Sequence, residues 1–382
     1  MKIFLSFLQS THKHPIPAYD FWEYYIKNGV VEAGHEWVEC PGIDWAAGLV
    51  PQSKNELAAW RRDVWNKTME WLTNNPVDLF LSYLYPKQID VSAIKQIQNM
   101  GMPCVNFYCD NVRDFKKIPT QFNAFDLNWV PEYKAIKLYK RAGCPYIYLP
   151  MPVWIEPKYR VHKQETNKQV TFIGSKDIQR ITLLNQVINI SPQIPLAIYG
   201  SGWLNAKTHQ VYNADYTLAK KILFNINFLA SQGLKAYIRK IAQLNNKPTV
   251  SNALQLKINE MLSPDEYIAL TSESMITLGI NRYPSYKFPL TQPDTYSRLR
   301  DIEAPMLGAC YLTEWTEGID DLYDTQNEIA VYKTGREMAD QINNLLNDPE
   351  RRKILRKNGQ EKALSMHSIP RSLNSIINTL GL

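Results

Sequence analysis

Short apolar runs alternate with longer amphipathic stretches over the first 150 residues of the chain. A short apolar run between turn-forming residues is typical of a strand in a buried parallel sheet, and apolar residues at every third or fourth position are typical of a helix that covers it. The predicted strands are 2–8, 35–40, 78–83, 103–108, 125–130 and 146–149. The predicted helices are 18–33, 55–74, 91–100 and 133–142. This alternation predicts a doubly wound α/β sheet.

A Pro-containing stretch at 150–167 predicts a linker, and the alternation restarts after it. The predicted strands of the second half are 169–173, 196–199, 274–280, 311–312 and 329–331. Its predicted helices are 178–188, 336–347 and 348–365. We therefore expect two Rossmann-like domains facing across a cleft, 1–155 and 168–365, with 366–382 as a C-terminal helix that packs back on the first domain.

Residues 204–262 interrupt this rhythm and predict a helical insertion in the second domain. Four cations, Lys235, Arg239, Lys240 and Lys247, form a basic patch in it. Such a patch is typical of the solvated face of a helical hairpin. It is also typical of a surface for an anionic or membrane-linked acceptor, and the two interpretations stay open.

Charge and cysteine content exclude several classes of protein. The net charge of +6 over 382 residues comes without a long cationic run, which argues against a nucleic-acid partner. The five cysteines are odd in number and include no CxxC pair, so neither a disulfide framework nor a zinc site is expected. A reducing compartment, the cytoplasm, is predicted, with peripheral membrane contact through the basic insertion as a further expectation.

The turn after the strand 169–173 has the chemistry of a phosphate site. Gly174 and Ser175 offer backbone N–H groups at a helix start, and Arg180 follows within that helix. Tyr199 and Gly200 end the next strand in the same way. The chain lacks GxxxxGK[ST] and GxGxxG at these turns, which excludes a P-loop and a bound dinucleotide cofactor. An ordinary strand–helix turn is the competing interpretation.

A second candidate is the segment RDIEAPMLGA at 300–309. The carboxylate of Glu303 at a helix start can accept hydrogen bonds from a ribose diol, and the guanidinium of Arg300 can bind a phosphate. Lys287, upstream, could supply another phosphate contact or be a solvated lysine. A simple Arg–Glu pair one helical turn apart is the alternative for Arg300 and Glu303.

Several phrases, in order, resemble the CgeB-like (spore maturation protein-like) glycosyltransferases of the GT-B superfamily. They are GHEWVEC, PVDLFLSYLYP, GMPCVNFYCDN, VTFIGSKDIQR, IYGSGW, RDIEAPMLGACYL and NLLNDPERRKILRKNGQEKAL. The resemblance covers most of the chain outside 204–262. It implies a GT-B fold and a glycosyltransferase whose C-terminal domain binds a nucleotide-diphosphate sugar of UDP or GDP type. It also implies a glycan, lipid-linked or protein acceptor.

The resemblance assigns roles to individual residues. Glu303 is the ribose-binding carboxylate, Arg300 belongs to an R-x-(F)-E pattern with Ile302 replacing Phe, and Arg180 binds the diphosphate. Many GT-B enzymes carry a second Glu eight positions before the ribose Glu, and here that position is Thr295. No D-x-D lies near a strand end, so no metal ligands are predicted and the transfer is expected to be metal-independent.

Three residues of the first half are candidates for the base that deprotonates an acceptor hydroxyl. Asp110 ends the strand CVNFYCD, and CgeB-like proteins tend to have Asp there; an Asx-turn or helix-cap role is its alternative. His12 and His14 follow the first strand, where a solvated loop histidine is the competing interpretation. A non-catalytic nucleotide- or sugar-binding protein, a phosphatase and a nucleotide-sugar epimerase remain as alternatives on the same fold.

Overall fold

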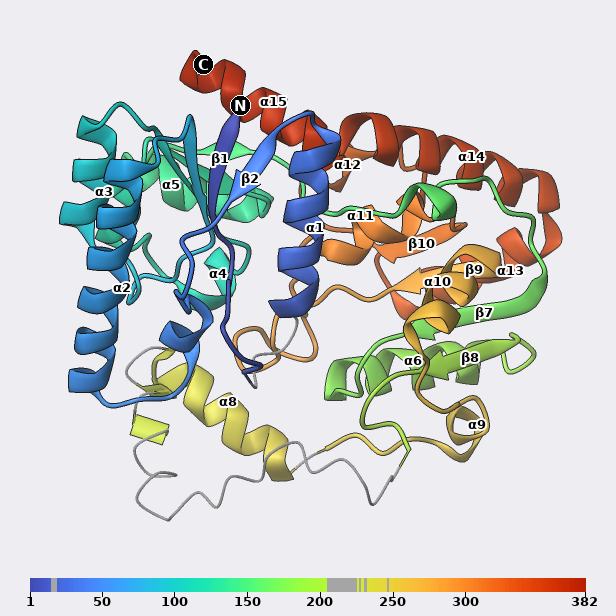
Figure 1. Ribbon diagram of the computed structural model, residues 1–382. Helices are drawn as coiled ribbons and strands as arrows, with labels where there is room; N and C mark the ends of the chain where they lie inside the picture. The colour runs from blue at the N-terminus through green and yellow to red at the C-terminus, as the bar shows by residue number, and fades with distance from the viewer. Residues whose placement is uncertain (15–18, 205–224, 227, 230–231, 246) are drawn as a thin grey trace. The chain divides into compact units, whose positions relative to one another are not determined.

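The computed structural model describes residues 1–14, 19–204, 225–226, 228–229, 232–245 and 247–382 (Figure 1). The chain divides into two compact units. Unit 1 comprises Met1–Glu156 and Lys362–Leu382, and unit 2 comprises Pro157–Glu361. The chain passes between them inside the predicted linker. The predicted helical character of 205–224, 227, 230–231 and 246 lies outside the described residues.

Unit 1 is built on a six-stranded sheet in the order β2-β1-β3-β4-β5-β6, and every pairing is parallel. Its strands are β1 (Lys2–Ser6), β2 (Glu36–Val38), β3 (Leu79–Ser82), β4 (Cys104–Phe107), β5 (Leu127–Val130) and β6 (Ile147–Tyr148). Strands β1, β3 and β4 lie inside the sheet, with another strand on each side. Their residues are almost entirely buried, as the apolar runs in the sequence predict.

Helices and short 3₁₀ turns connect these strands. They are α1 (Tyr19–Glu32), η1 (Ala46–Leu49), α2 (Lys54–Asn74), α3 (Val91–Asn99), α4 (Asn111–Asp114), η2 (Thr120–Ala124), η3 (Tyr133–Ala135) and α5 (Ile136–Ala142). The C-terminal helix α15 (Ile369–Leu380) packs on α1, where the side chain of Ile369 fills the space that a Cβ at Gly29 would need.

Unit 2 contains a five-stranded parallel sheet in the order β11-β10-β9-β7-β8. Its strands are β7 (Asn167–Ile173), β8 (Leu196–Tyr199), β9 (Ser274–Gly279), β10 (Tyr311–Glu314) and β11 (Ala330–Tyr332). Its helices are η4 (Pro157–Tyr159), α6 (Ile178–Ile190), α8 (Leu234–Asn245), α9 (Asn252–Gln255), α10 (Pro264–Glu273), α11 (Leu299–Met306), α12 (Ile319–Leu322) and α13 (Gly335–Asn347). The long helix α14 (Pro349–Met366) continues into unit 1.

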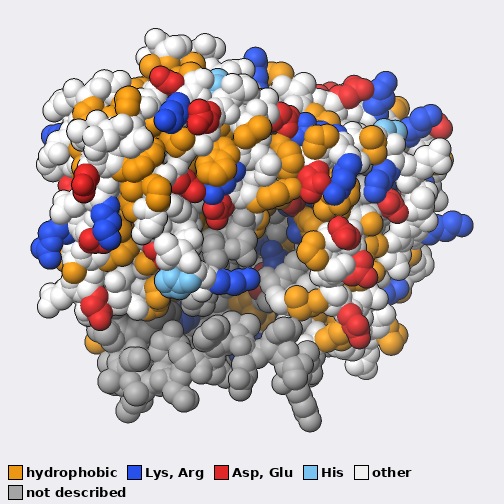
Figure 2. Space-filling model, viewed as in Figure 1, with side chains coloured by type: hydrophobic (Ala, Val, Ile, Leu, Met, Phe, Trp, Pro, Cys, Tyr) orange, Lys and Arg blue, Asp and Glu red, His pale blue; other side chains and the backbone are white. Residues whose placement is uncertain are grey.

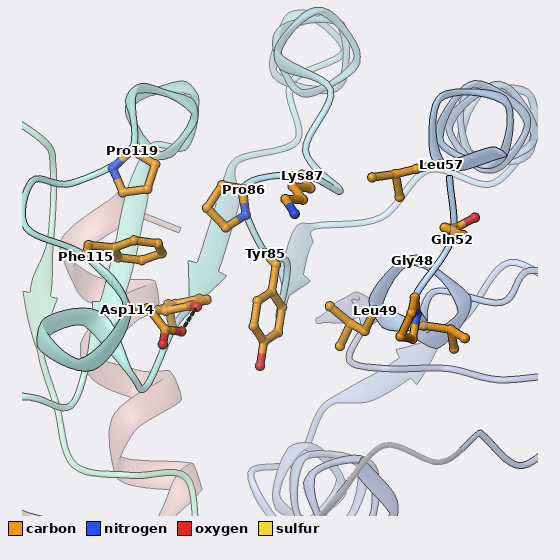
Figure 3. Close-up of a pocket in the computed structure, with 13 residues that line it drawn as sticks. Gly48, Leu49, Gln52, Leu57, Tyr85, Pro86, Lys87, Asp114, Phe115 and Pro119 are labelled. Atoms are coloured by element: carbon orange, nitrogen blue, oxygen red, sulfur yellow. Dashed lines mark hydrogen bonds between the residues drawn. The ribbon is translucent and has the colours of Figure 1, made fainter. Parts of the chain in front are cut away.

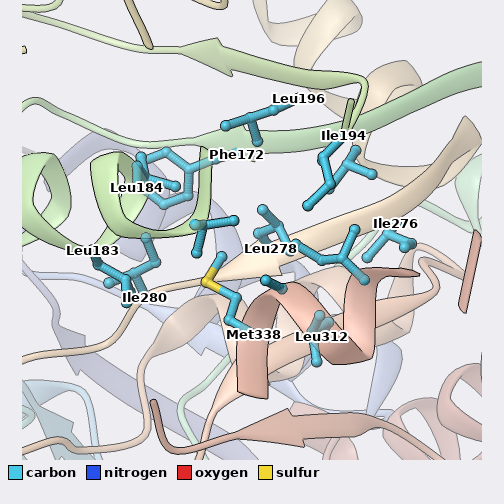
Figure 4. Close-up of a cluster of buried hydrophobic side chains, with 14 of the residues drawn as sticks. Phe172, Leu183, Leu184, Ile194, Leu196, Ile276, Leu278, Ile280, Leu312 and Met338 are labelled. Carbon is cyan, nitrogen blue, oxygen red and sulfur yellow. The ribbon is translucent and has the colours of Figure 1, made fainter. Parts of the chain in front are cut away.

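The core of unit 2 lies between its sheet and the helices α6 and α13 (Figure 4). Phe172, Leu278 and Leu312 come from three adjacent strands, and Leu184 and Met338 come from the two helices. All five side chains are at most 2% exposed. This packing holds the carboxyl end of β7 and the start of α6 in a defined position.

The predicted elements and the observed ones differ mainly at their ends. The first strand stops at Ser6 rather than at Leu8, because Leu8 adopts a φ of 60° that no strand can continue. Helix α10 was not predicted, although its start carries a Ser263–Glu266 capping box with Pro264 in the first turn.

Acidic and basic side chains are interspersed with hydrophobic ones over the face seen in Figure 2. Among the described residues, no helix combines the length and the apolar character that a bilayer crossing requires.

Candidate functional site

Two strand ends of unit 2 lie against each other at the predicted phosphate site. The Gly174 N–H donates to the Tyr199 carbonyl at 2.8 Å, and the Lys176 N–H donates to the Ser201 carbonyl at 2.8 Å. Gly200 has a φ of +130°, and a Cβ there would lie 2.4 Å from the Gly174 carbonyl oxygen. Only glycine therefore allows the turns after β7 and β8 to approach this closely.

The start of α6 places Arg180 over the first of these turns. The Asp177 carboxylate caps the helix by accepting from the N–H groups of Gln179 and Arg180 at 2.8 and 2.9 Å. The Arg180 guanidinium donates back to the Ser175 carbonyl at 2.6 Å and to the Ser175 hydroxyl at 3.0 Å. Arg180 of α6 is thus hydrogen-bonded to the Gly174–Ser175 turn, and phosphate binding by these residues stays a prediction.

Helix α11 brings two more arginines to the carboxyl end of β7. The Arg300 guanidinium donates to the Ile173 carbonyl and lies 5.4 Å from the centre of the Tyr267 ring. The Arg298 guanidinium lies 4.8 Å from the centre of the Tyr296 ring. Burial lowers the pKa of Arg180, and the positive charges of Arg298 and Arg300 lower it further. The charges of Arg298 and Arg300 therefore oppose that of Arg180, and a bound anion would relieve this repulsion.

The carboxylate of Glu303 lies one turn further along α11 and is 7% exposed. Its Oε2 accepts a hydrogen bond from the Tyr267 hydroxyl of α10. Burial raises the pKa of Tyr267, which keeps this phenol protonated and donating. Glu303 and Arg300 both contact Tyr267, so the structure brings these two predicted residues together.

Asp301 lies between Arg300 and Glu303 in the sequence, but its carboxylate is hydrogen-bonded within the protein. Its Oδ1 accepts from Asn281, Tyr311 and Thr313 at 2.7, 2.8 and 3.0 Å, and its Oδ2 accepts from the Arg298 N–H at 2.9 Å. This fully buried carboxylate anchors the start of α11 to β10. It orients the residues that carry the arginines and Glu303.

Three other positions singled out in unit 2 have described contacts of their own. The Tyr199 hydroxyl donates to Gln169, four residues before the end of β7, so it points back along the sheet. The backbone carbonyl of Lys287 accepts from Arg239 on α8. The Thr295 hydroxyl donates to the Trp315 carbonyl at 2.9 Å, so its one O–H is used by the backbone after β10.

Unit 1 brings both candidate histidines to one carboxylate, Asp44. Its Oδ2 lies 2.7 Å from His14 Nε2 and 3.5 Å from His12 Nδ1. The His14 side chain is 9% exposed and that of His12 is 68% exposed, so His14 is the buried member of the pair. The other oxygen, Asp44 Oδ1, accepts from the Ala47 N–H at 2.8 Å and so ties the pair to η1.

The same three residues have the composition of a metal site. In the described part of the chain, the ligand atoms of His12, His14 and Asp44 lie within 4.8 Å of one another. Imidazole and carboxylate are ligands that zinc-like transition metals accept. This set also matches a histidine oriented by a carboxylate for proton transfer.

Asp110 lies at the start of the short helix α4. Its side chain makes no capping hydrogen bond, and its Oδ2 lies 3.4 Å from Arg113. It therefore occupies the N-cap position of α4 without a side-chain capping bond. No described contact joins it to His12 or His14.

A cavity of about 770 Å³ opens in unit 1 at the carboxyl ends of β3 and β4 (Figure 3). Tyr85 projects into it between Leu49 on one side and Asp114 with Phe115 on the other. The Tyr108 hydroxyl donates to Asp114 at 2.6 Å on its wall. Aromatic faces beside a carboxylate are well suited to a sugar ring, which offers C–H groups and hydroxyls together.

Four of the residues that shape these sites escaped the sequence analysis: Asp44, Tyr267, Arg298 and Tyr85. Arg298 lies two residues before Arg300, and this spacing is a local signal for a second arginine at the same helix start. Asp44 and Tyr267 carry no local signal, because each meets its partner across at least 30 residues of chain.

Comparison with known proteins is consistent with this architecture. The sucrose-phosphate synthase from Thermosynechococcus elongatus superposes with a TM-score of 0.62 at 12% identity, covering 99% of this chain and 98% of that one. HepE from Anabaena, solved in complex with UDP and glucose, gives a TM-score of 0.57 at 13% identity, covering 100% and 99%. A glycosyltransferase from Rickettsia africae gives 0.59 at 11% identity, covering 99% and 97%.

These matches confirm the predicted GT-B fold of two parallel sheets with helices. No curated protein matches the chain by sequence. A family model described as glycosyl transferase-like matches residues 180–378, slightly more than half of the chain, and includes Arg180, Arg300 and Glu303. The chain therefore belongs to the glycosyl transferase-like family.

Proposed function

We propose that this protein transfers a sugar from a nucleotide-diphosphate sugar to an acceptor hydroxyl, with the donor bound in unit 2. The observation that carries this proposal is the cluster of Arg180, Arg298 and Arg300 at the carboxyl end of β7, beside the buried Glu303. Within the family we assign the chain to the CgeB-like group on its sequence phrases.

In the donor complex, the Gly174–Ser175 turn and the arginines contact the diphosphate, and Glu303 accepts from the ribose hydroxyls. The predicted donor set also contains Tyr199, Gly200 and Lys287, of which Gly200 allows the turn. UDP is the first nucleotide to test, because HepE was solved with UDP and with UDP-glucose. GDP is the second.

In the transfer, the acceptor oxygen forms a bond to the anomeric carbon, and the bond from that carbon to the diphosphate oxygen breaks. The electron pair leaves on the nucleotide diphosphate, whose added charge the arginines stabilise without a metal. The acceptor proton goes to a base, for which we favour His14 held by Asp44; His12 and Asp110 are the other candidates. Base-assisted displacement inverts the anomeric centre, so a product of retained configuration would exclude His14 from this role.

The acceptor binds in unit 1, at the cavity lined by Tyr85, Tyr108 and Asp114. The aromatic faces and the carboxylate of this cavity favour a saccharide acceptor, whether free, lipid-linked or attached to protein. We propose separately that the transferred group is a hexosyl or related sugar.

Calorimetric titration of Glu303→Gln with UDP and with uridine tests the donor assignment. Both ligands should bind roughly 1–3 kcal/mol more weakly, because the lost hydrogen bonds are to the ribose that they share. Glutamine keeps an acceptor for Tyr267, so the fold should persist. In Arg300→Lys, UDP should weaken while uridine is unaffected. The exposed Glu350→Gln on α14 is the matched control.

The alternatives predict different results. Unchanged UDP affinity in Glu303→Gln would remove Glu303 from the site. Tight UDP binding without hydrolysis or transfer of any UDP-, GDP-, CMP- or TDP-sugar would favour a binding protein. Interconversion of two nucleotide sugars without transfer would favour an epimerase. Activity lost on chelation and restored by a transition metal would reassign His12, His14 and Asp44 as metal ligands.

A further inference from the structure

Helix α8 has its apolar face turned toward solvent. Leu234, Ile238 and Ile241 follow one another at helical spacing, which places them in one stripe. They are 63%, 56% and 43% exposed. The usual arrangement is the reverse, with the apolar stripe on the protein and the polar face in water.

The opposite face attaches the helix to unit 2, mainly by polar contacts. The Arg239 guanidinium donates to the Lys287 carbonyl at 2.6 Å, and the Gln243 amide donates to the Ser285 carbonyl at 3.0 Å. Ala236, on this side, is 6% exposed. Ala236 and Gln243 each stand two positions after a residue of the stripe, which is about the other side of a helix. The stripe therefore points away from the helix's own attachment.

Further apolar side chains are exposed beside the helix. Ile226 and Leu229, shortly before it, are 56% and 38% exposed. Of the large apolar side chains that are exposed in the described residues, half lie between residues 204 and 261. Ile226 and Leu229 therefore add to the exposed apolar side chains next to α8 in the sequence.

The charged residues in and around α8 are all basic. Residues 225–259 contain five cations and no acidic residue, whereas the whole chain has a net charge of +6. Lys235 and Lys247 are exposed, and the Lys240 ammonium lies 4.4 Å from the centre of the Phe228 ring. Lys235 and Lys240 stand on either side of the apolar stripe.

We propose that α8 binds the surface of an anionic lipid bilayer. Its Leu and Ile side chains would enter the boundary between headgroups and acyl chains, and the flanking lysines would contact lipid phosphates. A nucleic acid would match the cations but would leave the apolar stripe in water. A second protein would bury the stripe but gives no reason for the absence of acidic residues. The proposal goes beyond sugar transfer and does not require it.

Co-sedimentation with vesicles tests this proposal on the full chain without substrate. One set of vesicles is pure phosphatidylcholine, and the other contains about 30% phosphatidylglycerol. The protein should bind only the anionic set and dissociate in about 0.5 M NaCl. Lys235→Gln should weaken binding about fivefold, the effect of one cation near the membrane.

Substitution of the stripe gives the second arm. Ile238→Glu should reduce vesicle binding at least tenfold while the thermal transition stays unchanged, because the side chain is mostly in water. Val161→Glu is the matched control, since Val161 is a 55% exposed apolar residue of the same unit. Its binding should equal that of the unsubstituted protein.

Four results would overturn the proposal. Equal binding to both sets of vesicles would show that charge plays no part. Binding unaffected by Ile238→Glu, or matched by binding to duplex DNA, would assign the segment to polyanions. A dimer in light scattering that Ile238→Glu converts to monomer, with no vesicle binding, would assign the stripe to a second copy.

Discussion

The candidate site of unit 2 contains three arginines, and each guanidinium makes a different contact with the protein. Arg180 is folded back on Ser175, Arg300 reaches the Ile173 carbonyl, and Arg298 stacks on Tyr296. Arginine stays charged in a partly buried site and has donors to spare beyond these contacts. A planar fork that is already held by the protein loses little freedom on binding a phosphate, which is why lysine would be a poor substitute.

At the same scale, Gly200→Ala should destabilise the fold. The new Cβ would lie 2.4 Å from the Gly174 carbonyl oxygen, in a backbone conformation that L side chains rarely adopt. The expected loss in the free energy of unfolding is about 1–3 kcal/mol, measured by urea denaturation.

Gly202→Ala provides the comparison for this substitution. Gly202 also has a positive φ, of +80°, but its nearest neighbour would lie 3.5 Å from the new Cβ. It should lose less stability than Gly200→Ala. Equal losses in the two variants would mean that backbone strain, and not the contact between the two turns, limits this position.

Helix starts are the elements that organise the unit 2 site. The Asp177 carboxylate caps α6 and also lies 3.2 Å from Arg180, so one side chain fixes both the helix and its cation. Asp301 plays the corresponding part for α11 through its buried hydrogen bonds. Both aspartates stabilise the helix starts that carry the proposed donor-binding residues, and neither is proposed to contact the donor.

Asp177→Ala should therefore affect stability more than binding. The loss of two capping hydrogen bonds should lower the free energy of unfolding by about 1 kcal/mol. UDP affinity should be unchanged or higher, because Arg180 loses a competing carboxylate. Ser53→Ala at the start of α2 in unit 1 is the matched cap control. A large fall in UDP affinity for Asp177→Ala alone would show that the cap is essential for placing Arg180.

At the scale of the whole molecule, the two units have separate candidate roles. Unit 2 contains the arginine cluster and Glu303, and unit 1 contains the histidine pair and the aromatic cavity. The five cysteines are free and buried, as expected for a chain without a disulfide framework. The proposed membrane surface belongs to unit 2.

Hydrogen exchange with saturating UDP should separate these roles. A ligand that binds only the native state raises the free energy of opening by about 2.7 kcal/mol when its concentration is a hundred times its Kd. The strongest protection should appear in residues 173–180 and 298–303. Protection confined to unit 1 would contradict the placement of the donor in unit 2.

The sequence by itself determined the two α/β halves, the strand–turn–helix at Gly174–Ser175 and the start of α11. These features depend on the periodicity of apolar residues and on residues close together in the sequence, so local sequence patterns are enough to predict them. The arginine cluster, the His14–Asp44 pair, the direction of Tyr199 and the outward stripe of α8 were decided only by the tertiary structure. The sheet order places β7 beside β9, although about 100 residues separate them, and so brings Arg300 to Ile173. Contacts of this kind depend on which strands become neighbours, and no local pattern in the sequence states that.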